Sequence, residues 1–191
     1  MRMEADWSVE IGPGLPVIDV AWNGFIDLRS SPERVAGIEE AQRHPAIREA
    51  LLVLNTGGSP VFTAKCDCWM LDESEIDPDE FAANRETART GFASYIDIVD
   101  IEPDQFVSFK LHEQQARAIV SALRTVDLLQ GRVDVVVRAA VLRERNGFGL
   151  TLYAAGCGAS EPDACAAWES VLAAAVAATI TAASQSPRMG E

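Results

Sequence analysis

Two of the four cysteines lie two positions apart in the stretch VFTAKCDCWML, residues 61–71, and the other two, Cys157 and Cys165, follow later. Four thiols are enough ligands for a zinc ion. A structural zinc site, however, usually draws its ligands from pairs with CxxC-type spacing. Neither the CxC of Cys66 and Cys68 nor the seven residues between Cys157 and Cys165 provides that spacing. We therefore expect no metal and no cofactor, and reduced thiols that serve as small core side chains.

The stretch 61–71 is predicted to be a strand, and its side chains then alternate between two faces. The apolar face, expected toward the core, carries Phe62, Ala64, Cys66, Cys68 and Met70. The opposite face carries Thr63, Lys65, Asp67 and Trp69. This second face combines two opposite charges with a large aromatic side chain, which is a composition that ligand sites use.

The same alternation in three further predicted strands extends this polar face. One strand contains Tyr95 and Asp97, and the other two form a pair with the valines of residues 133–141 directed to the core. The sequence therefore predicts a ligand-binding face made of Lys65, Asp67, Trp69, Tyr95, Asp97, Asp134, Arg138 and Tyr153. Aromatic walls with a few converging polar groups are typical of pockets for a small molecule or a peptide. Polar residues on the wet side of an antiparallel sheet are also common without any ligand, so an ordinary solvated face is the alternative.

Two other functions are compatible with these residues. An enzyme could use Lys65 with Asp67 or Asp97 as proton carriers, although nearby carboxylates raise the pKa of a lysine and so weaken this hypothesis. A protein-interaction or assembly subunit could use the acidic surface against a basic partner, or pack its small-residue C-terminal helix against a second copy. Of the three, a binding module for a small molecule or peptide uses the most distinctive grouping of residues.

Asn-Gly pairs stand between apolar stretches at residues 23–24 and 146–147. Both residue types tolerate the positive φ angles of a tight turn, so each pair predicts a β-hairpin. Helical spacing of apolar residues predicts helices within 30–55, interrupted at His44-Pro45, and within 112–126. A last helix is predicted from about Glu161, capped by Ser160.

Two strands followed by a helical segment thus occur three times in order along the chain. Hairpins imply a mainly antiparallel sheet, and helices that return after each strand pair would cover one face. We predict a single α+β domain over residues 1–191. The order of elements is similar to that of the mRNA cap-binding translation factor, by topology only, and implies no function.

Basic side chains number 16 and acidic ones 29, which gives a net charge of −13. This charge opposes both nucleic acid and anionic lipid, so we predict neither as a partner. The N-terminus lacks a secretory signal pattern, and the segment SVLAAAVAATITAA reads as a buried helix rather than a membrane span. A cytoplasmic location follows as an expectation, and the richness in arginine and alanine suggests a bacterial source. A homo-oligomer is compatible with the sequence.

Three weaker signals do not add a site. The stretch GCGASE at residues 156–161 opens a helix, but the acidic residues of the first turn would repel a phosphate. The acidic run DESEIDPDE lacks the pattern of a calcium loop. His112, in HEQQA, lacks the second histidine of a zinc-protease motif and is expected to be a surface or capping residue.

Overall fold

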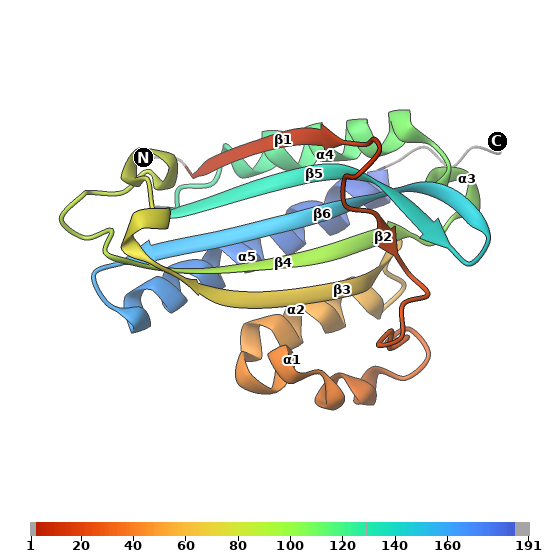
Figure 1. Ribbon diagram of the computed structural model, residues 1–191, viewed down its shortest axis with the longest axis horizontal. Coiled ribbons are helices and arrows are strands. Elements are labelled where there is room, and N and C mark those ends of the chain that lie inside the picture. The colour runs from red at the N-terminus through yellow and green to blue at the C-terminus, as the bar shows by residue number, and fades with distance from the viewer. Residues whose placement is uncertain (1–2, 129, 186–191) are drawn as a thin grey trace.

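The computed structural model describes residues 3–128 and 130–185, and its main feature is one sheet with helices behind it (Figure 1). The strands are ordered β1-β5-β6-β4-β3, and the short β2 lies beside β5. Their bounds are Glu4–Glu10 (β1), Ile18–Asp19 (β2), Val61–Leu71 (β3), Thr90–Asp100 (β4), Gly131–Leu142 (β5) and Arg145–Gly158 (β6). The pairs β3-β4, β4-β6 and β5-β6 are antiparallel, whereas β1 and β2 run parallel to β5. The predicted α+β class with a mainly antiparallel sheet is confirmed.

The helices follow the strand pairs in the predicted order. They are η1 (Pro32–Gly37), α1 (Glu39–Arg43), α2 (Pro45–Asn55), η2 (Glu73–Glu75), η3 (Pro78–Phe81), α3 (Pro103–Phe106), α4 (Phe109–Leu123) and α5 (Glu161–Gln185), where η marks a 3₁₀ helix. The break between α1 and α2 falls at His44, before Pro45, as the sequence predicts. The main core lies between the sheet and the buried sides of α2, α4 and α5.

Helix α5 fills the centre of the helical layer. Its Trp168 is fully buried, and the indole Nε1 donates a hydrogen bond of 2.8 Å to Ser94 Oγ on β4. Since a Cβ atom at Gly156 would lie 2.2 Å from the backbone nitrogen of Trp168, only glycine lets α5 approach β6 this closely. By length and composition alone this 25-residue helix could also cross a membrane, but in this fold it packs against the sheet.

The first Asn-Gly pair forms a turn but not the predicted hairpin. The amide of Phe25 donates to the carbonyl of Trp22 across Asn23 and Gly24, at 3.1 Å. The flanking residues do not pair with each other, and the strand on the N-terminal side is reduced to Ile18–Asp19. The predicted hairpin at this position is therefore wrong, and the segment instead lies over the face of the sheet opposite the helices.

The second hairpin exists, but its turn lies at Arg143 and Glu144 rather than at the Asn-Gly pair. Leu142 is paired with Arg145, and Arg143 adopts a left-handed conformation with φ of +58°. Gly147 serves a different purpose, because a Cβ atom there would come within 2.5 Å of the Phe106 ring and carbonyl. Residues 133, 135 and 137 still face the core, because moving the turn by three residues changes the register by an even number.

A β-bulge at Ala64 changes the faces of β3. Thr63 is paired with Ile98 and Lys65 with Asp97, so Ala64 is the extra residue. As a result Thr63 lies on the helix side, where its amide donates to Asn55 Oδ1 of α2, and Phe62 lies on the opposite side against Ile18. The predictions for Phe62 and Thr63 were therefore wrong. Ala64, also predicted on the core face, instead belongs to the cluster that contains Phe62 and Ile18. Beyond the bulge the alternation is as predicted, and Cys66 and Cys68 pack against the main core.

Two segments cover the ends of the sheet face that lacks helices α2, α4 and α5. One end is covered by Ile18, Val20 and Phe25 of the N-terminal segment, together with Phe106 of α3. The other end is covered by Ile76 and Phe81, which lie in and beside η2 and η3 and pack on Cys157. The middle of this face, between the two covering segments, carries the residues predicted to bind a ligand.

Candidate functional site

The register of the sheet places the eight predicted site residues on the face opposite the main core. One row across the strands contains Lys65, Asp97 and Thr151, and the next contains Asp67, Tyr95, Tyr153 and Asp134. Trp69 follows Asp67 along β3 by two residues, and Arg138 follows Asp134 along β5 by four. The strands therefore bring the eight side chains to one surface. Their role in ligand binding stays a prediction.

Three aromatic side chains form a continuous row on this surface. The ring centroids of Trp69 and Tyr95 lie 6.3 Å apart, and those of Tyr95 and Tyr153 lie 5.9 Å apart. Trp69 is 37% exposed, and both tyrosines are partly exposed. Burial, together with the charges of Asp97 and Asp67, raises the pKa of Tyr95 to about 12. The Tyr95 hydroxyl thus keeps its proton at neutral pH and can both donate and accept a hydrogen bond.

Asp97 is the buried carboxyl beneath this surface. Its side chain is only 8% exposed, and it accepts a hydrogen bond of 2.6 Å from the hydroxyl of Thr151. Burial raises the pKa of Asp97, while the Thr151 hydrogen bond and the charges of Arg138 and Lys65 act in the opposite direction. Burial is the larger effect, so Asp97 holds a proton to a higher pH than an exposed aspartate does.

The guanidinium of Arg138 already forms hydrogen bonds with two other side chains of the protein. Its Nη2 donates to Glu10 Oε2 of β1 at 2.8 Å and to the Tyr153 hydroxyl at 3.1 Å. Its Nε is buried and has no hydrogen-bond partner among residues 3–128 and 130–185. A ligand on this face could therefore reach the Arg138 guanidinium only through this one N–H group or by displacing Glu10. Glu10 could not be predicted from the sequence as a partner of Arg138, because its strand pairs with β5 across more than a hundred residues.

Asp134 belongs to a separate ion-pair group at one end of the face. The Arg132 guanidinium donates to both oxygens of Asp134, at 2.6 and 3.0 Å, and Nη1 of Arg132 lies 2.5 Å from Glu80 Oε2 of η3. These contacts tie η3 to β5. Of the eight predicted residues, Asp134 is thus the one whose carboxylate is already bidentately paired.

A cleft of about 320 Å³ opens beside β3 at the other side of this surface. Lys65 and Asp67 of β3 and Glu39 and Glu40 of α1 all line it. Trp22 also lines the cleft. Its Nε1 donates to the carbonyl of Ala64 at 2.9 Å, and the ammonium of Lys65 lies 5.6 Å from its ring centroid. Trp22 was not included in the predicted site because the predicted hairpin placed it in a strand. The helical segment that contains α1 was predicted, but a contact of Glu39 and Glu40 with this surface was not.

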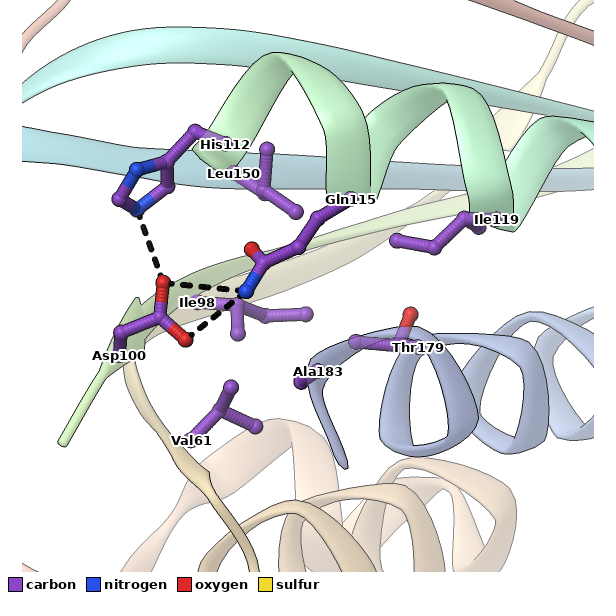
Figure 2. Close-up of a pocket in the computed structure, with 9 residues that line it drawn as sticks. All are labelled: Val61, Ile98, Asp100, His112, Gln115, Ile119, Leu150, Thr179 and Ala183. Atoms are coloured by element: carbon purple, nitrogen blue, oxygen red, sulfur yellow. Dashed lines mark hydrogen bonds and ion pairs between the residues drawn. The ribbon is translucent and has the colours of Figure 1, made fainter. Parts of the chain in front are cut away.

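A second polar cluster lies inside the helical layer (Figure 2). His112 and Gln115 of α4 point toward Asp100 at the end of β4, and His112 and Asp100 are each 1% exposed. The amide of Gln115 donates to Asp100 Oδ1 at 3.2 Å. The enclosed space between these side chains is about 10 Å³, which is close to the least that holds one water molecule.

His112 is therefore not the surface or capping residue that the sequence suggested. Its Nδ1 lies 2.9 Å from the carbonyl oxygen of Ser108, and since that oxygen only accepts, Nδ1 donates. Its Nε2 lies 3.1 Å from Asp100 Oδ2, although the approach is not aligned as a hydrogen bond. The helix periodicity of 112, 116, 119 and 123 was the signal that could have placed His112 on the buried side.

The cysteines do not come together. Cys66 and Cys68 are half-buried on the helix side of β3, Cys157 is buried under η3, and Cys165 lies on α5. Burial, with Glu40 as the next cause, raises the pKa of Cys66 to about 12 and that of Cys68 to about 11. Within residues 3–128 and 130–185, no three His, Cys, Asp or Glu side chains are grouped so that they could hold a metal ion.

Comparison with known proteins finds no relative of this chain. No protein-family model, no curated protein and no solved structure matches the chain. The function must therefore be argued from the residues of the sheet face and its surroundings alone.

Proposed function

We propose that this protein is a binding module that holds a small molecule or a peptide on the open part of its sheet. The observation that carries the proposal is the row of Trp69, Tyr95 and Tyr153, left partly exposed between the two segments that cover the ends of the face. Aromatic rings are costly to leave in water, and a ligand with a flat apolar group would bury them.

The charges beside this row favour a ligand with a basic group. Asp67 is exposed next to Trp69, and Asp97 lies beneath Tyr95, whereas Arg138 is already paired with Glu10. The net charge of −13 acts in the same direction over a longer range. A cation placed over Trp69 or Tyr95 would gain both an ion pair with Asp67 and a cation–π contact.

A thermal-shift screen of small molecules and short peptides, followed by titration calorimetry of each hit, tests the proposal. Trp69→Ala is expected to weaken binding at least tenfold, because the ligand loses its main apolar contact. Met70→Ala is the matched control, since Met70 is the next residue on the same strand, is 41% exposed and points to the opposite side. Equal binding by both variants and the wild type would show that the aromatic row is not the site.

A second candidate function, acid–base catalysis on the same face, is favoured by the raised pKa of Asp97. A carboxyl that keeps its proton to a higher pH than an exposed aspartate is better suited to act as a general acid, and Lys65 and Asp67 are the other charged groups near it. An enzyme of this type would lose turnover in Asp97→Asn while still binding its substrate. A binding module would show no turnover of any ligand found in the screen, in either form.

A further inference from the structure

The outer edge of β3 is buried before the Ala64 bulge and exposed or half-buried after it. β3 is the last strand of the sheet on its side, with α1 and α2 next to it (Figure 1). Residues 61–64 are all buried, whereas residues 65–71 are exposed or half-buried. Trp69 and Met70 are 37% and 41% exposed, which is unusual for two large apolar side chains on an edge strand.

Before and at the bulge, side chains of other segments occupy the backbone groups of this edge. Asn55 Oδ1 accepts the amide of Thr63 at 3.1 Å, and Trp22 Nε1 donates to the carbonyl of Ala64 at 2.9 Å. These two side chains therefore bind the backbone groups that a neighbouring strand would otherwise pair with. The edge is thus closed by the protein itself as far as Ala64.

After the bulge the edge is open. In an antiparallel pair, alternate residues direct both backbone groups away from the partner strand. The amide of Cys68 donates to the side chain of its neighbour, Asp67 Oδ1, at 2.8 Å, so this N–H points away from β4. A partner strand that pairs with Cys68 would take the place of this Asp67 oxygen. Cys66, Cys68 and Met70 therefore share the outward direction. No other segment of the described chain provides a hydrogen bond to the outward groups of Cys66 and Met70.

The surroundings of this open edge are acidic. The cleft of about 320 Å³ lies beside its first residues, and Glu39, Glu40 and Asp67 all line it. Among residues 3–128 and 130–185, Lys65 is the one basic side chain that lines the cleft, and its ammonium lies 5.6 Å from the centroid of the Trp22 ring. A lysine or arginine side chain of a partner would find three carboxylates within this space.

We propose that residues 66–70 of β3 accept an extended, basic peptide segment of a partner protein as an additional strand. Its backbone would pair with the outward groups of Cys66, Cys68 and Met70, and a basic side chain would enter the acidic cleft. Main-chain pairing provides affinity and side-chain pockets provide selectivity in this mode of recognition. The proposal goes beyond ligand binding on the sheet face, because it uses the backbone edge and does not need the aromatic row.

The probe for the test is a fluorescein-labelled peptide of alternating lysine and valine, six residues long, measured by fluorescence polarisation at low and high salt. We expect it to bind the wild type, and binding to weaken as salt screens the carboxylates. The same peptide with glutamate in place of lysine is expected not to bind. A version with alternate backbone nitrogens methylated keeps the charge but cannot pair with the edge, and it is expected to lose at least tenfold in affinity.

Two substitutions of Cys68 distinguish the contribution of its backbone N–H to peptide binding from that of its side chain. Cys68→Pro removes the outward N–H without removing a ladder hydrogen bond, and it is expected to weaken peptide binding at least tenfold. Cys68→Ala keeps the N–H and is expected to bind as the wild type does. Should the proline variant fail to fold, hydrogen exchange of the wild type replaces it: the amides of Cys66 and Met70 should exchange more slowly when the peptide is present.

Three outcomes would overturn the proposal. One is equal binding of the lysine and glutamate peptides, and another is equal binding of the methylated and unmethylated peptides. The third is a dimer in light scattering that Cys68→Pro dissociates, which would show that the edge pairs with a second copy. None of these results would affect the sheet-face proposal, which is tested by Trp69→Ala.

Discussion

The hydroxyl of Thr151 donates a 2.6 Å hydrogen bond to the carboxyl of Asp97, and both side chains are buried on neighbouring strands under the candidate ligand face. Asp97 and Thr151 are paired across β4 and β6 and form a buried part of the candidate site. The hydrogen bond between them lowers the pKa of Asp97, but burial raises that pKa by more. The ionised form of Asp97 is therefore destabilising in the folded protein relative to the unfolded chain, and the stability of the protein should depend on pH for this reason.

The first prediction concerns that pH dependence. Because the pKa of Asp97 is raised in the folded state, its favourable contribution is complete below the ordinary aspartate pKa of 3.8 and is lost as the pH rises through the folded value. Urea unfolding of the wild type and Asp97→Asn across this range should show the wild type losing stability relative to the variant as the pH rises. A constant difference between the two curves would contradict the raised pKa.

The hydroxyl of Thr151 gives the second prediction. Thr151→Val keeps the shape of the side chain but leaves the Asp97 carboxyl without its donor, and it should lower the free energy of unfolding at pH 7 by about 1–3 kcal/mol. Thr151→Ser keeps the hydroxyl and should cost less. If the serine variant is as unstable as the valine variant, the loss comes from packing of the methyl group rather than from the hydrogen bond.

The sequence predicted the faces of the central strands better than it predicted their turns. The turn between β5 and β6 lies three residues before Asn146-Gly147, yet residues 133–137 remain on the core side because the resulting change of register is even. The two glycines of the Asn-Gly pairs are explained by close packing. Gly147 packs against Phe106, and Gly24 packs against the ring of Trp22, where an added Cβ atom would lie only 2.0 Å from a ring carbon.

What could not be predicted depends on contacts between distant segments. The bulge at Ala64 reversed Phe62 and Thr63, and it is held by Trp22 and Asn55 from two other parts of the chain. Likewise, Asp100 meets His112 only because α4 turns back over the end of β4. No local pattern of residues marks either contact. The eight residues of the candidate face were placed together because alternation beyond the bulge is a local property.

The close approach of α5 to β6 gives the third prediction. A methyl group at Gly156 would lie 2.2 Å from the backbone nitrogen of Trp168, and a backbone atom cannot move aside alone. Gly156→Ala should therefore destabilise the protein by about 1–3 kcal/mol or more in urea unfolding. Gly37→Ala is the control, since nothing lies within 4 Å of the added atom, and it should change stability by under about 1 kcal/mol.

The buried contact of Asp100 with His112 gives the fourth prediction. Removing the imidazole leaves the buried Asp100 carboxyl with one polar contact fewer, so His112→Ala should cost about 1–3 kcal/mol of unfolding free energy. The neighbouring Glu113 forms an exposed pair with Arg117 at 2.9 Å, and Glu113→Ala should cost under about 1 kcal/mol. In a double-mutant cycle, His112→Ala combined with Asp100→Ala should cost less than the two single changes together. Simple additivity would mean that the two side chains do not interact.

The thiols of β3 provide the last prediction. A pKa of about 11 leaves about one thiol in a thousand ionised at pH 8, so iodoacetamide should label Cys68 and Cys157 slowly in the folded protein and Cys66 more slowly still. Glu40→Gln removes a charge that raises the pKa of Cys66 and Cys68, whereas burial alone raises that of Cys157. Mass spectrometry of the labelled peptides should therefore show faster labelling of the β3 cysteines in this variant and no change at Cys157. Faster labelling of all three would instead indicate a general opening of the fold.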